Sequence, residues 1–178
     1  MRIVSGKYKG KRFDVPRSFK ARPTTDFAKE SLFNILMNNY VDFGEGLRAL
    51  DLFSGTGSIS LEFLSRGCSE VISIEKDFNH WQFLKRIQHD LGDQGWRPVH
   101  ADVFKFVERL KDKFDIIFAD PPYALKNLGD LPEIILSKDI LSPDGVFILE
   151  HGKDYDFSSN TRFIEHRSYG SVNFSFFR

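Results

Sequence analysis

The most regular feature of this chain is an alternation of short apolar runs with longer segments in which apolar residues recur at helical spacing. Runs typical of buried strands cover residues 47–53, 70–76, 97–102, 113–120 and 145–151, and helical spacing covers 58–66, 78–91, 103–110 and a segment after Leu128. Strands that alternate with helices form a mostly parallel sheet with helices on both faces. The pattern therefore predicts an α/β fold.

The carboxyl-terminal end departs from this alternation. Residues 161–170 and 171–178 are both strand-like, and a Gly-Ser turn joins them without an intervening helix. Such a connection predicts an antiparallel pair at the edge of the sheet, for seven strands in all.

The amino-terminal end predicts two further elements. Apolar residues between Phe27 and Tyr40 recur near helical spacing, which indicates a helix over about 25–40. Ahead of it, β-favouring runs around Gly6 and Gly10 predict a small hairpin rather than an unstructured tail. We therefore divide the chain into a hairpin arm, residues 1–22, and a main domain, residues 23–178.

The composition fits a protein of this size with one core. The chain has 178 residues, and 41% of them are hydrophobic, including 19 Phe, enough to fill the interior of one domain. No run approaches the roughly 20 apolar residues of a membrane span, and the start MRIVSGKYKGKRF lacks the apolar centre of a secretory signal. The single Cys68 cannot form an internal disulfide and is expected in the core. We expect a cytoplasmic protein without a membrane partner, and the histidines show no spacing typical of metal ligands.

Charge is distributed unevenly although the formal net charge is +0. The arm has a net charge of +7, because eight basic residues stand against Asp14 alone, and the rest of the chain has a net charge of −7. This asymmetry suggests a polyanionic partner, and charge alone leaves a solvated basic tail as an equal alternative. The basic residues that we expect to contact nucleic acid are Arg2, Lys7, Lys9, Lys11, Arg12 and Arg17.

Polar residues stand where three successive predicted strands end. In open α/β sheets ligands bind beyond the carboxyl ends of the strands. The first strand is followed by Asp51-Leu52-Phe53-Ser54-Gly55-Thr56-Gly57, whose glycines allow a ligand to approach the backbone. A dinucleotide fingerprint requires a third Gly, or an Ala, where this chain has Ser60, and this departure counts against NAD.

Acids end the second and third strands. Glu75 can accept hydrogen bonds from both hydroxyls of a ribose. Asp102 can accept a hydrogen bond from an exocyclic amine such as that of adenine, and the apolar Val103 and Phe104 can flank the base ring. Each acid alone has another interpretation, as a helix cap or a first-turn acid. Taken together with the glycine loop, these acids are harder to explain as caps and indicate a nucleotide site.

The fourth strand ends in FADPPYA, with Asp120, Pro121, Pro122 and Tyr123. An aryl amine is a poor nucleophile because its lone pair is delocalised, and acceptors for its N–H groups make it more reactive. Asp120 and the carbonyl of Pro121 can provide these acceptors, and Tyr123 can stack on the ring. The alternative interpretation is a turn that ends a strand, for which Asp-Pro-Pro suffices.

These motifs resemble the class I S-adenosylmethionine-dependent methyltransferases, in which DLFSGTG follows the first strand and acids end the next two. The resemblance implies a Rossmann-like fold and S-adenosylmethionine as cofactor. It places Gly55 and Gly57 along the methionyl part, Glu75 at the ribose and Asp102 at adenine. The cofactor-binding residues that we expect are Asp51, Phe53, Gly55, Gly57, Glu75, Lys76, Asp102, Val103, Arg22 and Thr24. The catalytic ones are Asp120, Pro121 and Tyr123.

The opening RIVSGKYKGKRFDVP and the segment ARPTTDFAKESLFNIL narrow the resemblance. Together with DLFSGTGS and DPPY, they are similar to the bacterial 16S rRNA guanine-N2 methyltransferases, the RsmD family. This implies methyl transfer to one loop guanine of 16S rRNA within the small ribosomal subunit, by a chain that we expect to be a monomer. Arg22, Thr24 and Thr25 lie between arm and main domain, near the cofactor or the entering nucleotide, unless they are only a linker and a helix cap.

Two other functions remain open on the sequence alone. An adenine-N6 methyltransferase acting on DNA or RNA shares the DPPY chemistry, although a DNA enzyme would need a sequence-reading domain for which 178 residues leave little room. A non-catalytic rRNA-binding assembly factor could keep the same fold, but it would not need Glu75 and Asp102.

Overall fold

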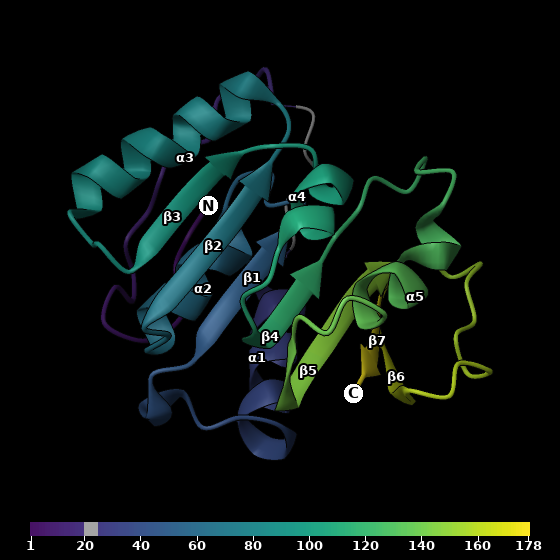
Figure 1. Ribbon diagram of the computed structural model, residues 1–178. Coiled ribbons are helices and arrows are strands. Elements are labelled where there is room, and N and C mark those ends of the chain that lie inside the picture. Colours follow the sequence, from purple (N-terminus) through teal and green to yellow (C-terminus); the bar gives the residue numbers. More distant parts are fainter. Residues whose placement is uncertain (20–24) are drawn as a thin grey trace.

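The computed structural model describes residues 1–19 and 25–178. In it the strand-like segments form one sheet, and helices lie between them along the chain (Figure 1). Its strands are β1 (Arg48–Leu52), β2 (Glu70–Glu75), β3 (Trp96–His100), β4 (Phe114–Ala119), β5 (Leu141–His151), β6 (Phe163–Tyr169) and β7 (Val172–Phe177). The sheet is 7-stranded, in the order β3-β2-β1-β4-β5-β7-β6. Strand β7 runs antiparallel to both β5 and β6, and the pairs from β3 to β5 are parallel. The predicted mostly parallel sheet with an antiparallel carboxyl-terminal pair is confirmed.

Helices cover both faces of the sheet. They are α1 (Asp26–Asn39), α2 (Ser58–Arg66), α3 (Phe78–Leu91), α4 (Val103–Arg109) and α5 (Leu131–Leu136), with short 3₁₀ turns η1 (Phe43–Glu45) and η2 (Leu128–Asp130). In Figure 1, α4 and α5 lie in front of the sheet and α1 and α2 behind it. None of the helices within the described ranges combines the length and the apolar character needed to cross a bilayer.

The core has two halves because successive residues of a strand point to opposite faces. In β4, Ile116 and Phe118 pack with α1, α2 and α3, whereas Ile117 and Ala119 pack with α4 and α5. Burial on both faces explains why β4 is a continuous apolar run in the sequence. Cys68 is 3% exposed, as expected for a core residue.

The amino-terminal segment folds back on itself. We call residues 1–13 the basic loop. It is closed by one antiparallel bridge between Arg2 and Arg12, with hydrogen bonds from Ile3 N to Lys11 O (3.0 Å) and from Phe13 N to Met1 O (3.0 Å). The predicted hairpin is thus present with a single bridge between its two arms, and Ile3 is buried against the main domain. The boundary that we predicted between residues 22 and 23 lies outside the described residues.

Candidate active site

A cavity of about 720 Å³ lies at the carboxyl ends of the central strands. Strand β1 pairs with β2 on one side and β4 on the other, so the strand order reverses at this point, where open α/β sheets bind ligands. The predicted residues that line the cavity are Asp51, Phe53, Gly55, Glu75, Lys76, Asp102, Val103, Asp120, Pro121 and Tyr123. Side chains distant in the sequence therefore share one site.

The loop between β1 and α2 has a backbone that favours glycine. Gly55 and Gly57 have φ of 53° and 76°, in the left-handed region, and Phe53 also has a positive φ of 62°. Gly57 is not among the residues that line the cavity. A Cβ there would lie 2.6 Å from Leu84 Cδ2 of α3, so its lack of a side chain serves helix packing. The structure thus separates two glycines to which the sequence assigned one role.

Glu75 is held at the end of β2 by backbone donors. Its Oε2 accepts a hydrogen bond from Gly55 N (2.8 Å) and its Oε1 accepts one from Asp77 N (2.7 Å). His80 Nδ1 lies 3.9 Å from Oε2, and the ring of Phe19 packs on His80 with centroids 4.1 Å apart. Each oxygen has a second lone pair, so the carboxylate can still accept hydrogen bonds from hydroxyl groups on the cavity side.

Asp102 caps α4 and also lines the cavity. Its Oδ1 accepts hydrogen bonds from Phe104 N (3.1 Å) and Lys105 N (3.3 Å), and Lys76 Nζ lies 3.0 Å from Oδ2. The hydrogen bond from Lys76 and the backbone donors hold the pKa of the Asp102 carboxyl below its usual value. The cap considered from the sequence is present, and the carboxylate remains an ionised acceptor at the cavity wall.

Asp51 is a buried carboxyl at the end of β1, with 2% of its surface exposed. It accepts a hydrogen bond from Ser60 Oγ, and Ser60 Oγ lies 2.6 Å from Ser73 Oγ, which in turn accepts from Trp96 Nε1 (2.7 Å). Burial raises the pKa of Asp51 to about 7, against the hydrogen bond from Ser60 and with the repulsion of the Asp120 carboxyl. Ser60, which departs from the dinucleotide fingerprint, therefore serves as the hydrogen-bond partner of Asp51.

Asp120 and the residues after it line the cavity at the end of β4. Burial raises the pKa of Asp120 to about 7, so the carboxyl titrates near neutral pH. The turn that follows is closed by a hydrogen bond from Leu125 N to Pro122 O (2.8 Å). Pro121 is buried, whereas Tyr123 is 43% exposed at the cavity rim. The turn considered from the sequence exists, and it carries an acid and an aromatic ring into the site.

Some predicted residues lie elsewhere. Arg22 and Thr24 fall outside the described residues, whereas Thr25 lines the cavity and also caps α1, since its Oγ1 accepts from Ala28 N (3.2 Å). The six basic residues that we expected to contact nucleic acid are all exposed and lie away from the cavity lining. Arg2 pairs with Asp26 (2.9 Å) and Lys7 with Asp93 (2.7 Å).

Several residues that line the cavity were not predicted from the sequence, among them Glu150 and His80. Glu150 is 5% exposed near the end of β5, and His80 lies on α3 beside Glu75. Glu150 could have been found, because the rule that ligands lie beyond the carboxyl ends of parallel strands applies to the fifth strand as well. No signal in the sequence marks His80, which depends on the direction in which α3 leaves β2.

The strand order, the glycine loop and the acids at the strand ends define the class I methyltransferase fold. The comparison with known proteins agrees. The solved structure of a hypothetical protein from Thermus thermophilus matches with a TM-score of 0.87 and 30% identity, over 100% of this chain and 99% of that one.

The particular family is also shown. The family model described as "Conserved hypothetical protein 95" matches residues 1–178, and the chain belongs to this family, the RsmD family. The "Ribosomal RNA small subunit methyltransferase D" of Escherichia coli (strain K12) is 31% identical over 84% of this chain and 74% of its own. The protein of that name from Haemophilus influenzae is 30% identical over 86% of this chain and 80% of its own. The chain is therefore a methyltransferase by family and by fold.

Proposed function

We propose that this protein transfers a methyl group from S-adenosylmethionine to the N2 amine of a loop guanine of 16S rRNA in the small ribosomal subunit. The observation that carries the proposal is the position of Asp120, whose carboxyl shares one cavity with Glu75 and Asp102. An acceptor for an amine thus faces the site expected for a nucleoside. The relatives named small subunit rRNA methyltransferases support the choice of RNA.

The cavity fits the proposed cofactor in size and in chemistry. About 720 Å³ lies within the range of small-molecule sites, roughly 300–1,000 Å³. Glu75 would accept hydrogen bonds from the ribose hydroxyls, and Asp102 would accept one from the adenine amine. The glycine loop at Gly55 would allow the methionyl part to approach the backbone. S-adenosylmethionine supplies a methyl group whose bond to sulfur breaks, with the electron pair left on sulfur, as the amine nitrogen forms the new bond.

The residues of the chain prepare the amine. The Asp120 carboxylate and the Pro121 carbonyl would accept hydrogen bonds from its two N–H groups and localise the lone pair on nitrogen. Tyr123, exposed at the rim, would stack on the guanine and fix its plane. The nitrogen is cationic once methylated, and its proton leaves to Asp120 or to water.

The substrate end of the proposal rests on charge. Proteins reach single RNA bases in loops, where bases can be splayed out, and cationic side chains hold the flanking phosphates. The exposed cations of the basic loop suit this role. We further propose that the protein acts as a monomer in the cytoplasm.

One experiment tests the proposal and separates the alternatives. Purified protein is incubated with labelled S-adenosylmethionine and small subunits from a strain that lacks the activity, and the modified nucleotide is mapped and identified. We expect N2-methylguanosine at one position of 16S rRNA. N6-methyladenosine would instead identify an adenine methyltransferase, and the absence of both transfer and cofactor binding in calorimetry would favour a non-catalytic assembly factor.

A further inference from the structure

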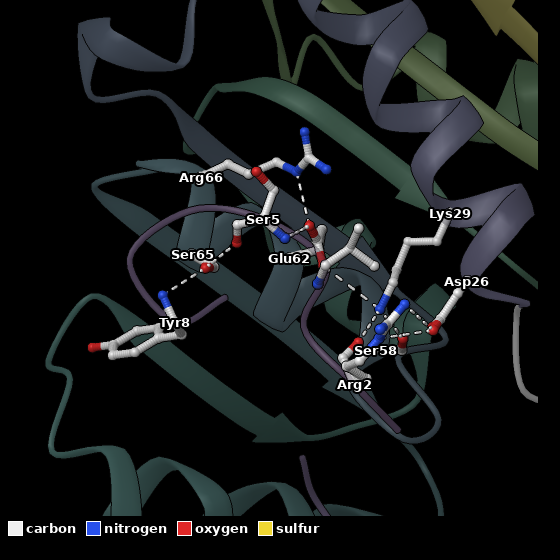
Figure 2. A network of polar contacts seen from close by, with 10 residues as sticks. Arg2, Ser5, Tyr8, Asp26, Lys29, Ser58, Glu62, Ser65 and Arg66 are labelled. Carbon is white, nitrogen blue, oxygen red and sulfur yellow. Dashed lines mark hydrogen bonds and ion pairs between the residues drawn. The ribbon is translucent and has the colours of Figure 1, made fainter. Parts of the chain in front are cut away.

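The basic loop is attached to the main domain through a carboxylate in the middle of α2. Glu62 is fully buried, with 0% of its surface exposed. Its Oε2 accepts a hydrogen bond from Val4 N (2.9 Å), and its Oε1 accepts one from Ser5 N (2.9 Å) and one from Arg66 Nε (2.9 Å). Figure 2 shows this carboxylate between the loop and the neighbouring cations. A short stretch of loop backbone is therefore held by a charged side chain, which makes these hydrogen bonds strong.

A buried lysine connects the same carboxylate to the cavity. Lys29 of α1 is 1% exposed, and its Nζ lies 3.6 Å from Glu62 Oε2. The ammonium donates hydrogen bonds to Arg2 O (2.6 Å) and to Ser58 Oγ (3.1 Å), and Ser58 lines the cavity (Figure 2). The network thus reaches from the loop to the first residue of α2.

A second set of contacts holds the tip of the loop. Ser65 O accepts from Lys7 N (2.7 Å), and Ser65 Oγ accepts from Tyr8 N (2.9 Å) and donates to Ser5 O (2.5 Å). The Tyr8 hydroxyl donates to Asp93 Oδ2 (2.7 Å), beyond α3. Gly6 lies so close to α2 that a Cβ there would be 1.8 Å from Ser65 O.

A buried ion network of this kind is an inefficient way to gain stability. Burying charges costs several kcal/mol per ion, and apolar replacements are often as stable. A network that binds loop backbone at several points instead fixes geometry. In the basic loop, the exposed Lys9, Lys11 and Arg12 have no ion pair with another described residue, so their cationic groups are available on a backbone that these contacts hold in place.

We infer that the basic loop is a preformed phosphate-docking surface, and that Glu62 is the positioning residue that holds it at a fixed distance from the methyl-transfer cavity. The inference rests on the proposed RNA substrate. It predicts that the position of the cations matters as well as their number, because phosphates gripped at the wrong distance would place the guanine away from Asp120.

Gly6→Ala and Gly10→Ala form a matched pair for the test. Both glycines lie in the basic loop at left-handed φ, 81° and 85°, so an alanine is strained at either position. The Cβ at Gly6 meets the backbone of α2, whereas that at Gly10 has nothing within 4 Å. Both variants keep every cation, so only Gly6→Ala is expected to lift the loop from its anchor.

We expect Gly6→Ala to raise the KM for small subunits about tenfold or more, with kcat within about twofold and with unchanged cofactor affinity, and to make RNA binding less salt-dependent. Gly10→Ala should stay within about threefold of wild type. Ser65→Ala, which removes only one hydroxyl, should shift KM in the same direction by a smaller factor. Wild-type KM in Gly6→Ala, or an equal increase in Gly10→Ala, would overturn the inference.

Hydrogen exchange separates this inference from the proposed function. The amides of Val4 and Ser5 should exchange as slowly as those of α2 in wild type and rapidly in Gly6→Ala. Rapid exchange in wild type would show that the loop is not preformed, whatever the substrate. Slow exchange in a protein that methylates no RNA would support a preformed, anchored loop and refute the proposed RNA substrate.

Discussion

Asp120→Asn tests the proposed chemistry most directly, because it keeps the size of the side chain and removes its charge. Burial raises the pKa of the wild-type carboxyl to about 7. The carboxyl then becomes ionised mainly around neutral pH, and the nearby Asp51 carboxyl broadens this titration, so kcat/KM for the methyl donor should increase by up to about tenfold between pH 6 and pH 8. Asp120→Asn should remove this increase. In wild type, the rise of kcat with pH should have its midpoint at a lower pH than the rise of kcat/KM. The reason is that the bound cationic donor lowers the pKa of Asp120 by stabilising its carboxylate.

The size of the loss follows from the hydrogen bond that the carboxylate would make. A hydrogen bond to a charged acceptor contributes about 1.5–3 kcal/mol, which corresponds to about 10- to 160-fold in rate. Asp120→Ala loses this bond and the proton acceptor together, so we expect a loss of at least that size, up to about 10⁴-fold. Asp120→Asn keeps a neutral acceptor and should retain more activity than the alanine variant.

The assay is the initial rate of labelled methyl transfer to small subunits between pH 6 and pH 8, with cofactor affinity measured in parallel by calorimetry. Affinity within a few-fold of wild type in both variants shows that the cavity is intact. Equal losses of activity in the two variants would refute the prediction that hydrogen-bond acceptance by Asp120 matters more than proton removal. A pH dependence of wild-type size that persists in Asp120→Asn would show that another group titrates.

Three further changes address the site and the helix packing beside it. Glu75→Gln cannot accept the same backbone donors on both oxygens, so cofactor affinity in calorimetry should fall about tenfold or more, whereas Glu70→Gln, at the other end of β2, should bind as wild type. Gly57→Ala combines a left-handed φ of 76° with a contact of 2.6 Å, so urea denaturation should show a larger loss than Gly92→Ala, which has φ of 65° and open space, by about 1 kcal/mol or more. The raised pKa of Asp51, about 7 in the folded state against 3.8, means that its contribution to stability is present below pH 4 and is lost as pH rises through 7. Asp51→Asn should therefore flatten the decline in unfolding free energy between pH 5 and pH 8, and an unchanged decline would assign it to other groups.

The fold was predictable because each part of the sequence carries a local signal for it. The continuous apolar run of 113–120 marks a strand buried on both faces, and β4 occupies Phe114–Ala119. The helix expected over 25–40 is found at Asp26–Asn39, with the Thr25 cap. The start of β5 was missed by four residues, because Leu141–Asp144 contains Ser, Pro and Asp, which resemble a loop.

The site was predictable where a side chain follows the end of a strand and unpredictable where packing decides. Asp51, Glu75 and Asp120 lie where the strand-end rule places them. Glu62 carries no such signal, since a glutamate within a helix is ordinarily exposed. Its burial depends on the basic loop, which lies about 57 positions earlier in the chain and contributes the backbone donors. Contacts of this separation leave no local pattern in the sequence.

Helix α2 therefore links the cavity and the basic loop, which the sequence presents as separate features. Its first residue, Ser58, lines the cavity, and Glu62, one turn further on, holds the basic loop. A nine-residue helix, Ser58–Arg66, is short and rigid, so the loop and the cavity cannot shift independently while Glu62 keeps its hydrogen bonds. A base held at Asp120 and phosphates held by the loop would then have a fixed separation. The proposed specificity for one guanine would then depend on the geometry of α2 as much as on the residues proposed to contact the base.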